Sequence, residues 1–446
     1  MRRRRLFALA AVLLAARRAT AADNGPAIDA ALRRMLTPDG AQQLDGLRRL
    51  IALGDPKAVP GLIAMLFWLE DDNHPAIAAA LTGFTGAALG PAWFDWVVWQ
   101  QAHPEFPAHA SMDGFLADLF ADLDPQFSRF IRAGIAHAIR LEEITWGGVK
   151  VDGIPALDDP ATLAARDADY LNPDDLVFAA VVGGQARAWP GRIIAWHEMV
   201  NDTLGGVKLV LSYCTLCGAA VLYDGRVAGR DQPFSFGSSG LLYRSNKLMY
   251  DRQTDSLWNQ FTGRPVVGAL TGSGLALTPL PLVTTRWADW RAAHPDTSVL
   301  SLATGFTRDY APGVAYSKYF ASPDLAFPAG FSDRRLAPKD KVFGLRLPGG
   351  LKAWRLSDFA GGAVINDVVG LQQVVLIGDA AREEVRAYAS DGRHFTAAGA
   401  MQLRAGREIW EITETELRGP AGQTLSRLPG HIAYWFAWAG YFPDAL

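Results

Sequence analysis

The sequence predicts an α+β protein in which a helical HEAT-like repeat region precedes a tandemly duplicated, β-rich α+β domain. Three observations carry this prediction: apolar residues at helical spacing before residue 145, short apolar runs separated by Gly, Pro, Asn and Asp after it, and a match of the chain to itself at an offset of 165 positions. The chain has 446 residues, half of them apolar, which is enough for two or three hydrophobic cores.

The first 22 residues have the pattern of a signal peptide. Residues 2–5 are all Arg, residues 6–16 are an apolar run, and residues 19–21 read Ala-Thr-Ala, a small-residue cleavage site. The apolar run is shorter than the roughly 20 residues that span a bilayer, and no later run is long enough. We expect a periplasmic or extracellular protein without a transmembrane segment, exported by the general secretory or the twin-arginine route.

The charge balance argues against nucleic acid as a partner. The chain has 43 basic and 46 acidic residues, but six of the basic residues lie within the first eighteen positions. Without that segment the net charge is −9. Nucleic-acid binding and binding to anionic membranes normally show as a basic patch or stripe, so we expect neither.

Residues 23–145 are predicted to form the helical domain. Leucines recur at helical spacing, and Gly54-Asp55-Pro56 and residues 72–77 each have the form of a turn followed by a new helix. This pattern is similar to the short helix pairs of HEAT-type repeats, whose surfaces usually hold partners. We therefore expect any protein partner to bind here. Trp93, Phe94, Trp96 and Trp99 could form a docking surface or, in the simpler interpretation, part of the core.

The internal match is the most informative feature of the rest of the chain. Residues 177–205 align without a gap to residues 342–370, with eight identities in 29 positions that include a Trp and an Asn-Asp pair. Further matches follow as far as Asp444. We predict a first α+β copy over 146–300, a linker over 301–334 and a second copy over 335–446.

Short elements are predicted within the first copy. Residues 177–182 and 186–189 have the pattern of two strands joined by a turn, residues 192–200 that of a helix, and residues 209–213 that of a buried strand. The Asn201-Asp202 pair, present in both copies, is most simply a helix-end or turn device.

The reactive candidates belong to the first copy. Cys214 and Cys217 are the only cysteines, and the same offset places Asp379 and Arg382 opposite them. Their spacing lets both sulfurs bind one ion or form a tight disulfide. His197, on the apolar face of the predicted helix, is a candidate third ligand, and it has no counterpart in the second copy.

Several interpretations of the cysteine pair stay open. With Met249 as the least certain fourth ligand, two thiolates and an imidazole would suit copper, and zinc would also accept the thiolates and the imidazole. A structural disulfide, a thiol–disulfide exchange pair and two inert thiols are the alternatives. The leading hypothesis is a metal-binding or redox centre, and the competing one is a non-enzymatic binding or scaffold protein with a structural disulfide. Copper or zinc is the only cofactor expected.

A polar run beside an aromatic residue is a candidate pocket lining. It includes Asp251, Arg252, Trp258 and Gln260, to which Glu198 beside His197 is added. Asp251, Arg252 and Asp255 could equally form an ion network within a turn.

Long motifs in a fixed order resemble domain of unknown function family 3179. They are residues 146–149 (Trp-Gly-Gly-Val), 196–202 (Trp-His-Glu-Met-Val-Asn-Asp), 213–218 (Tyr-Cys-Thr-Leu-Cys-Gly), 236–242 and 249–260. The resemblance covers about residues 144–446 and implies an exported prokaryotic protein, with no activity to carry over. The family's Tyr-Cys-Pro-Leu-Cys has Thr215 in place of Pro here, which implies a less rigid loop between the sulfurs.

Overall fold

The computed structural model describes residues 24–330 and 333–442, so the predicted signal peptide lies outside the described residues. Contacts divide the chain into two compact units. One consists of the chain up to Trp96 together with His103–Phe115, and the other of Val97–Ala102 together with Leu116–Leu446. Within the described ranges, no helix has the length and apolar character needed to cross a membrane.

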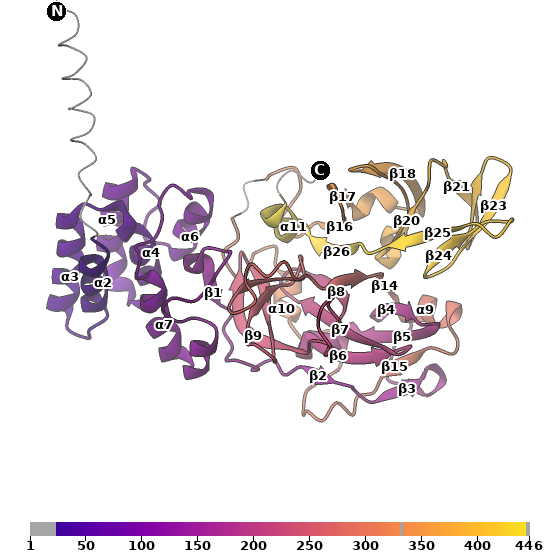
Figure 1. Ribbon diagram of the computed structural model, residues 1–446, viewed down its shortest axis with the longest axis horizontal. Coiled ribbons are helices and arrows are strands. Elements are labelled where there is room, and N and C mark those ends of the chain that lie inside the picture. The colour runs from indigo at the N-terminus through magenta and orange to yellow at the C-terminus, as the bar shows by residue number, and fades with distance from the viewer. Residues whose placement is uncertain (1–23, 331–332, 443–446) are drawn as a thin grey trace, which may run out of the picture. The chain divides into compact units, whose positions relative to one another are not determined.

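The N-terminal unit is helical, as the sequence predicts (Figure 1). Its elements are α2 (Gly25–Met35), α3 (Gly40–Leu53), α4 (Val59–Trp68), α5 (His74–Thr85) and the adjoining parts of α6 (Trp93–Ala102) and α7 (Met112–Leu123). Gly54 ends α3 in a left-handed conformation. A Cβ at Gly46 of α3 would lie 2.6 Å from the carbonyl oxygen of Ala31, so glycine allows α2 and α3 to pack closely. The predicted turn at Gly54-Asp55-Pro56 is confirmed, and Trp96 is buried.

Over its described residues, the second unit is built from five sheets. The first has the order β1 (Ile144–Trp146), β9 (Phe236–Tyr243), β10 (Asn246–Asp251), β11 (Leu257–Asn259), β12 (Arg264–Val267). The second has the order β13 (Thr278–Leu280), β8 (Ala219–Asp224), β7 (Val207–Cys214), β6 (Met199–Leu204), β2 (Leu157–Asp158). The third has the order β14 (Val283–Arg286), β4 (Leu176–Val182), β5 (Gln185–Pro190), β15 (Ser298–Leu300), β3 (Thr162–Ala164).

Two further sheets lie in the C-terminal part of the chain. The smaller has the order β17 (Gly350–Arg355), β16 (Lys341–Leu347), β26 (His431–Tyr434). The larger has the order β18 (Ala363–Val369), β19 (Gln372–Asp379), β20 (Glu384–Ala389), β25 (Thr424–Leu428), β24 (Glu416–Arg418), β23 (Glu408–Ile412), β22 (Gln402–Ala405), β21 (Thr396–Gly399). Besides the adjoining parts of α6 and α7, the α-helices of the whole second unit, within the described residues, are α8 (Gly191–His197), α9 (Trp287–Ala293), α10 (Ser317–Ala321) and α11 (Trp435–Tyr441).

The predicted strands at 177–182, 186–189 and 209–213 are confirmed as β4, β5 and β7. The predicted helix at 192–200 is too long, because α8 ends at His197 and Glu198 takes a φ of 56°. A left-handed residue cannot continue a right-handed helix, so the chain enters β6 instead. Asn201 and Asp202 therefore lie within a strand, and the turn predicted for them is wrong.

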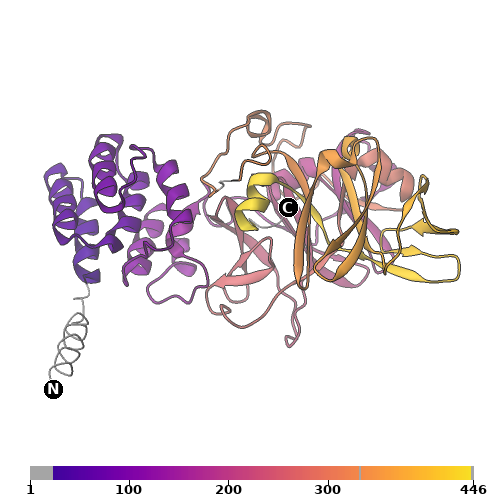
Figure 2. The same ribbon diagram turned by 90° about the horizontal axis from the view of Figure 1, so that it is seen from above.

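The first strand set (β4–β8, residues 176–224) and the second strand set (β16–β20, residues 341–389) have corresponding elements, coloured magenta and orange in Figure 2. Shifting β4, β5, β7 and β8 by 165 positions reproduces the bounds of β16, β17, β19 and β20. The indole nitrogens of Trp189 and Trp354 donate to Asp202 and Asp367, over 3.0 and 2.8 Å. The two sets therefore share elements, register and a Trp–Asp side-chain hydrogen bond, which is buried in the first set and partly buried in the second.

Residues that are far apart in the sequence of this unit complete one hydrophobic core. Cys214, Cys217 and Met249 pack in the same buried cluster as Tyr434 and Phe436 from β26 and α11. The C-terminal segment thus covers the loop that carries the cysteines.

Candidate functional site

The cysteine loop is a tight turn between β7 and β8. Cys214 is the last residue of β7, and the amide of Cys217 donates to the carbonyl of Cys214 over 3.1 Å. Gly218 closes the turn with a φ of 58°, and a Cβ at this position would lie 3.1 Å from the Tyr434 ring. Glycine is therefore favoured here both for its conformation and for space. The two sulfurs lie 2.7 Å apart, and both cysteines are free thiols.

The two cysteines have different surroundings. Cys214 lines a cavity of about 40 Å³, whereas Cys217 is fully buried and does not line it. Burial raises the pKa of the Cys217 thiol well above its ordinary value, and its hydrogen bond with Cys214 acts in the same direction. Asn246 opposes this shift by donating to the Cys217 sulfur over 3.3 Å. Cys217 is thus held as a neutral thiol behind the sulfur that faces the cavity.

A hydrogen-bonded network fixes the residues behind Cys217. The Asn246 amide also donates to the Oε1 atom of Gln260 over 2.7 Å. Gln260 in turn donates to the carbonyls of Ser212 and Ala219, which belong to the strands on either side of the cysteine loop. Gln260, predicted to line a pocket, is instead a buried residue that holds this loop against β10.

A buried ion pair stands beside Cys214 in the cavity. Lys247 of β10 donates to Glu198 over 2.5 Å, and both side chains are less than a tenth exposed. Glu198 also accepts from the hydroxyl of Thr215 over 2.9 Å, and Tyr316 lies 3.5 Å from it. Glu198, Lys247, Tyr316 and Cys214 all line the cavity, so the thiol shares a small space with one cation, one carboxylate and one phenol.

Three non-glycine residues at this site have a backbone φ that is positive. Glu198, Ser245 and Tyr316 have φ values of 56°, 63° and 55°, although none is glycine. The carbonyl of Ser245 lies 3.3 Å from the Cys217 sulfur, in the turn that joins β9 to β10. Such conformations cost of order 1 kcal/mol each and tend to persist where a functional geometry needs them.

His197 is not brought to the cysteines. Its Nδ1 lies 2.8 Å from the carbonyl oxygen of Pro155, and its Nε2 lies 2.6 Å from the Tyr310 hydroxyl. Burial lowers the pKa of His197, so the ring is neutral at pH 7, donates through Nδ1 and accepts through Nε2. Both ring nitrogens are already in use, and the histidine connects the end of α8 to the segment around Tyr310.

The predicted metal ligands are therefore not assembled as a set. Within the part of the chain that the structure describes, no three His, Cys, Asp or Glu side chains are grouped so that they could hold a metal ion. Met249 is fully buried in the apolar cluster that contains both cysteines. Two thiolates on one tetrahedral zinc ion stand about 3.8 Å apart, since each Zn–S bond is about 2.3 Å, and the sulfurs here are closer than that.

The remaining pocket candidates, Asp251, Arg252 and Trp258, lie at the turn between β10 and β11 and do not line this cavity. Asp251 accepts from the backbone and the hydroxyl of Thr254 and, over 2.8 Å, from the indole of Trp258. Arg252 pairs with Asp158, and Asp255 pairs with Arg129. The polar run is a turn whose ion pairs reach outward to other segments.

Sequence reasoning missed the residues that complete the site. Lys247, Asn246, Ser245 and Tyr316 were not identified, although Asn246 and Lys247 stand in the polar start of an otherwise apolar strand. Lys247 is the one residue that could have been recognised from the sequence, because a lysine in a strand that is buried along its whole length needs a buried partner. Tyr316 gave no signal, since 118 positions separate it from Glu198.

The comparisons with known proteins agree with the motifs. No curated protein matches the chain. No solved structure matches it. A family model described as Protein of unknown function (DUF3179) matches residues 151–445, which include both strand sets and the cysteine loop. The chain belongs to this family.

Proposed function

We propose that Cys214 and Cys217 form a redox centre of an exported protein, periplasmic or extracellular, that alternates between a dithiol and a disulfide. One observation carries the proposal: two buried free thiols lie 2.7 Å apart, and only Cys214 lines a cavity. Little movement is needed to join them. The pair thus resembles the dithiols of thiol–disulfide exchange proteins, in which one sulfur reacts with the substrate and the other then forms the disulfide.

The size of the cavity limits the co-reactant. A volume of about 40 Å³ has room for about three water-sized molecules. A peroxide has this size, so it can reach Cys214 inside the cavity. In the proposed reaction the Cys214 thiolate attacks one peroxide oxygen, the O–O bond breaks, and the products are a sulfenic acid and hydroxide, which takes up a proton to give water.

Cys217 then completes the oxidation. Its sulfur attacks the Cys214 sulfenic acid, an S–S bond forms, and the hydroxyl leaves as water with the thiol proton. Peroxide is thereby reduced to two waters and the dithiol is oxidised to a disulfide. Two equivalents of a thiol return the pair to the dithiol by exchange. Lys247 and Glu198 position the peroxide, because one offers donors and the other an acceptor beside Cys214.

The test is a redox titration of untagged protein purified from its native envelope. The protein is equilibrated in thiol–disulfide buffers of graded potential, quenched with acid and alkylated, and its mass counts the free thiols. We expect one reversible two-electron transition, absent from Cys214→Ser and Cys217→Ser. A pair that stays fully oxidised or fully reduced at every potential contradicts the proposal and favours a structural disulfide or inert thiols.

Two further measurements sharpen the assignment. Cys217→Ser should accumulate a Cys214 sulfenic acid that a dimedone probe traps, whereas Cys214→Ser should not. Oxidation by hydrogen peroxide should be at least tenfold faster than oxidation by bulky cumene hydroperoxide. Elemental analysis of the same preparation decides the competing hypothesis, since stoichiometric copper or zinc lost on alkylation would replace a redox pair with a metal site.

We also propose that the two strand sets arose by duplication within the chain, and that only the first kept a reactive loop. Equal spacing of the strands, the two Trp–Asp bonds and the matching Asn pairs support this. Asn201 exchanges two hydrogen bonds with the backbone of Phe236, and Asn366 exchanges two with that of Phe395. For the helical region we propose HEAT-type repeats that hold a protein partner.

A further inference from the structure

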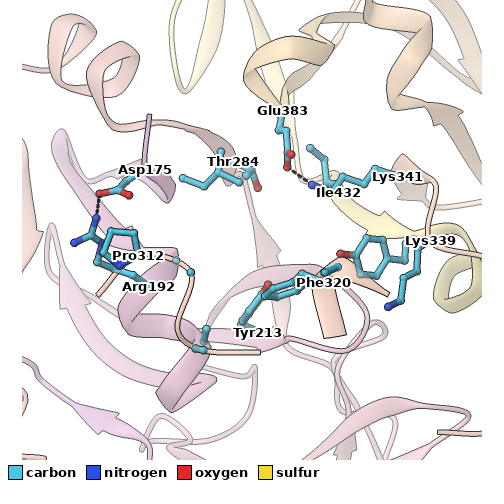
Figure 3. Close-up of a pocket in the computed structure, with 18 of the residues that line it drawn as sticks. Asp175, Arg192, Tyr213, Thr284, Pro312, Phe320, Lys339, Lys341, Glu383 and Ile432 are labelled. Carbon is cyan, nitrogen blue, oxygen red and sulfur yellow. Dashed lines mark hydrogen bonds and ion pairs between the residues drawn. The ribbon is translucent and has the colours of Figure 1, made fainter. Parts of the chain in front are cut away.

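A second, larger cavity lies on the other side of the cysteine loop. Its volume is about 740 Å³, within the range of roughly 300–1,000 Å³ that small-molecule sites occupy. Tyr213 and Gly218, the residues on either side of the Cys-x-x-Cys motif, line it, whereas Cys214 lines the small cavity. Figure 3 shows that residues from both strand sets and from the segment around Phe320 surround the space.

Two ion pairs stand on separate walls of this cavity. Arg192 of α8 pairs with Asp175, and Lys341 of β16 pairs with Glu383 over 2.5 Å (Figure 3). Each pair is neutral as a whole. Glu383 has a φ of 53°, and its position corresponds to Gly218 after the shift of 165. The second strand set thus contributes a charged wall where the first contributes the cysteine turn.

Lys339 is a third cation, and among the described residues no carboxylate forms a direct ion pair with it, although Asp324 attracts it from a greater distance. Its Nζ donates to the carbonyls of Tyr319 and Ser322 over 2.6 and 2.7 Å and lies over the Tyr319 ring. Carbonyl dipoles and a ring face hold an ammonium group without neutralising it. Since the two ion pairs cancel, the charged residues lining the cavity leave one net positive charge, carried by Lys339.

The rest of the lining is mainly apolar and aromatic. Phe178, Phe320 and Ile432 line the space together with the phenols Tyr213 and Tyr434. Burial raises the pKa of Tyr434 to about 12 and that of Tyr213 well above its ordinary value, so both rings are neutral at pH 7. Neutral aromatic walls favour a flat, apolar ligand body.

We propose that this cavity binds an organic anion with a flat apolar body, whose single anionic group pairs with Lys339. The aromatic walls hold the body, and Lys339 selects the charge. Neither role requires Cys214 or Cys217 to react, so the site stands apart from the redox centre. The cavity is therefore a ligand site shared by the two strand sets.

The test uses two fluorescent probes with the same aromatic body. Anilinonaphthalene sulfonate carries one negative charge, and phenylnaphthylamine lacks the sulfonate. We expect saturable binding of both to the full chain, with the sulfonate bound more tightly. Lys339→Met should weaken the sulfonate about tenfold, the size of one charge-assisted hydrogen bond, and leave the uncharged probe unchanged. Lys208→Met, which removes an exposed lysine outside the cavity, should change neither.

A second variant tests the location. Thr284→Trp fills the cavity from β14 and should weaken both probes at an unchanged unfolding midpoint. Absence of saturable binding, or equal weakening of both probes by Lys339→Met, would overturn the proposal. The double variant Cys214→Ser with Cys217→Ser should bind both probes as the wild type does. A failure of the redox proposal therefore leaves this result intact, and a failure of probe binding leaves the redox proposal intact.

Discussion

The first and second strand sets have the same arrangement of strands, but they differ in the turn that follows the corresponding strands β7 and β19. At the end of β7 the chain forms the cysteine turn, with Gly218 at the left-handed position. At the end of β19, Asp379 caps a short turn by accepting from the amide of Ala381 over 2.9 Å, and Glu383 is left-handed. The same backbone corner therefore accommodates either a pair of thiols or a charged turn. The strands that form the framework are therefore the same whether or not the loop at their end carries the cysteines.

The difference extends to the residues behind each corner. The first set has Glu198 in contact with Lys247, whereas the same shift places Ala363 opposite Glu198. Burying an ion pair costs several kcal/mol of desolvation, which the mutual attraction offsets only when the geometry is good. At the second corner the framework stands without this pair, and Lys341 pairs there with the more exposed Glu383. The buried ion pair of the second set lies elsewhere, between Arg386 and Glu414.

The largest expected effect is at this ion pair. Lys247→Met leaves the Glu198 carboxylate buried without its cation and should lower the free energy of unfolding by about 3–5 kcal/mol. The double variant Glu198→Gln with Lys247→Met should recover most of the loss, because no uncompensated charge remains. Chemical denaturation of the reduced protein measures both.

A matched control is Lys208→Met, which removes an exposed lysine that pairs with Asp159. Its effect should be under about 0.5 kcal/mol. A loss in the double variant as large as in Lys247→Met would mean that packing, not charge, makes the site stable.

The next effect compares the two Trp–Asp bonds. Asp202 is 4% exposed and pairs with Arg187, whereas the Lys352–Asp367 pair is about a quarter to a third exposed. Asp202→Ala should cost about 3 kcal/mol and Asp367→Ala about 1 kcal/mol, because solvent compensates only the second. Equal losses in denaturant unfolding would contradict the assigned difference in burial.

A smaller effect tests the left-handed corner itself. Gly218→Ala must adopt a φ near 58° and place a Cβ 3.1 Å from the Tyr434 ring, so we expect a loss of about 1–2 kcal/mol. Glu383→Gly should be nearly neutral, since relief of the same strain offsets the lost pairing with Lys341. Thermal unfolding of both variants measures this, and a tolerated Gly218→Ala would show that the corner can shift.

The smallest expected effect is a pH dependence of the free energy of unfolding that comes from Cys217, a residue of the first strand set only. The folded-state pKa of Cys217 is raised above its ordinary value of 9.0, so the folded protein keeps a proton that the unfolded chain releases. The resulting stability is present below pH 9 and is lost as the pH rises through the folded pKa. Reduced wild-type protein should therefore lose stability above pH 9 more steeply than Cys217→Ser, in which the tyrosines still titrate. Parallel curves would contradict the raised pKa.

Local patterns were sufficient to predict much of the second unit. The strands β4, β5 and β7 follow from short apolar runs bounded by glycine, and the cysteines were correctly placed at the end of a buried strand. The helix predicted over 192–200 is too long, because no local sequence pattern there indicates that Glu198 adopts a positive φ. Its carboxylate is drawn into contacts with Thr215 and Lys247, which local propensity does not include.

The sequence by itself determined that a helical region precedes a β-rich part, where the cysteine pair stands, and that the two strand sets are parallel in their spacing. It did so because periodicity, turn residues and internal matches are local properties of the chain. The tertiary structure alone decided what surrounds the sulfurs. It placed His197 on Tyr310 instead of the cysteines, and it brought Lys247 and Tyr316 to Glu198. These partners are 49 to 118 positions apart, and only the packing of a shared core brings such distant residues into contact.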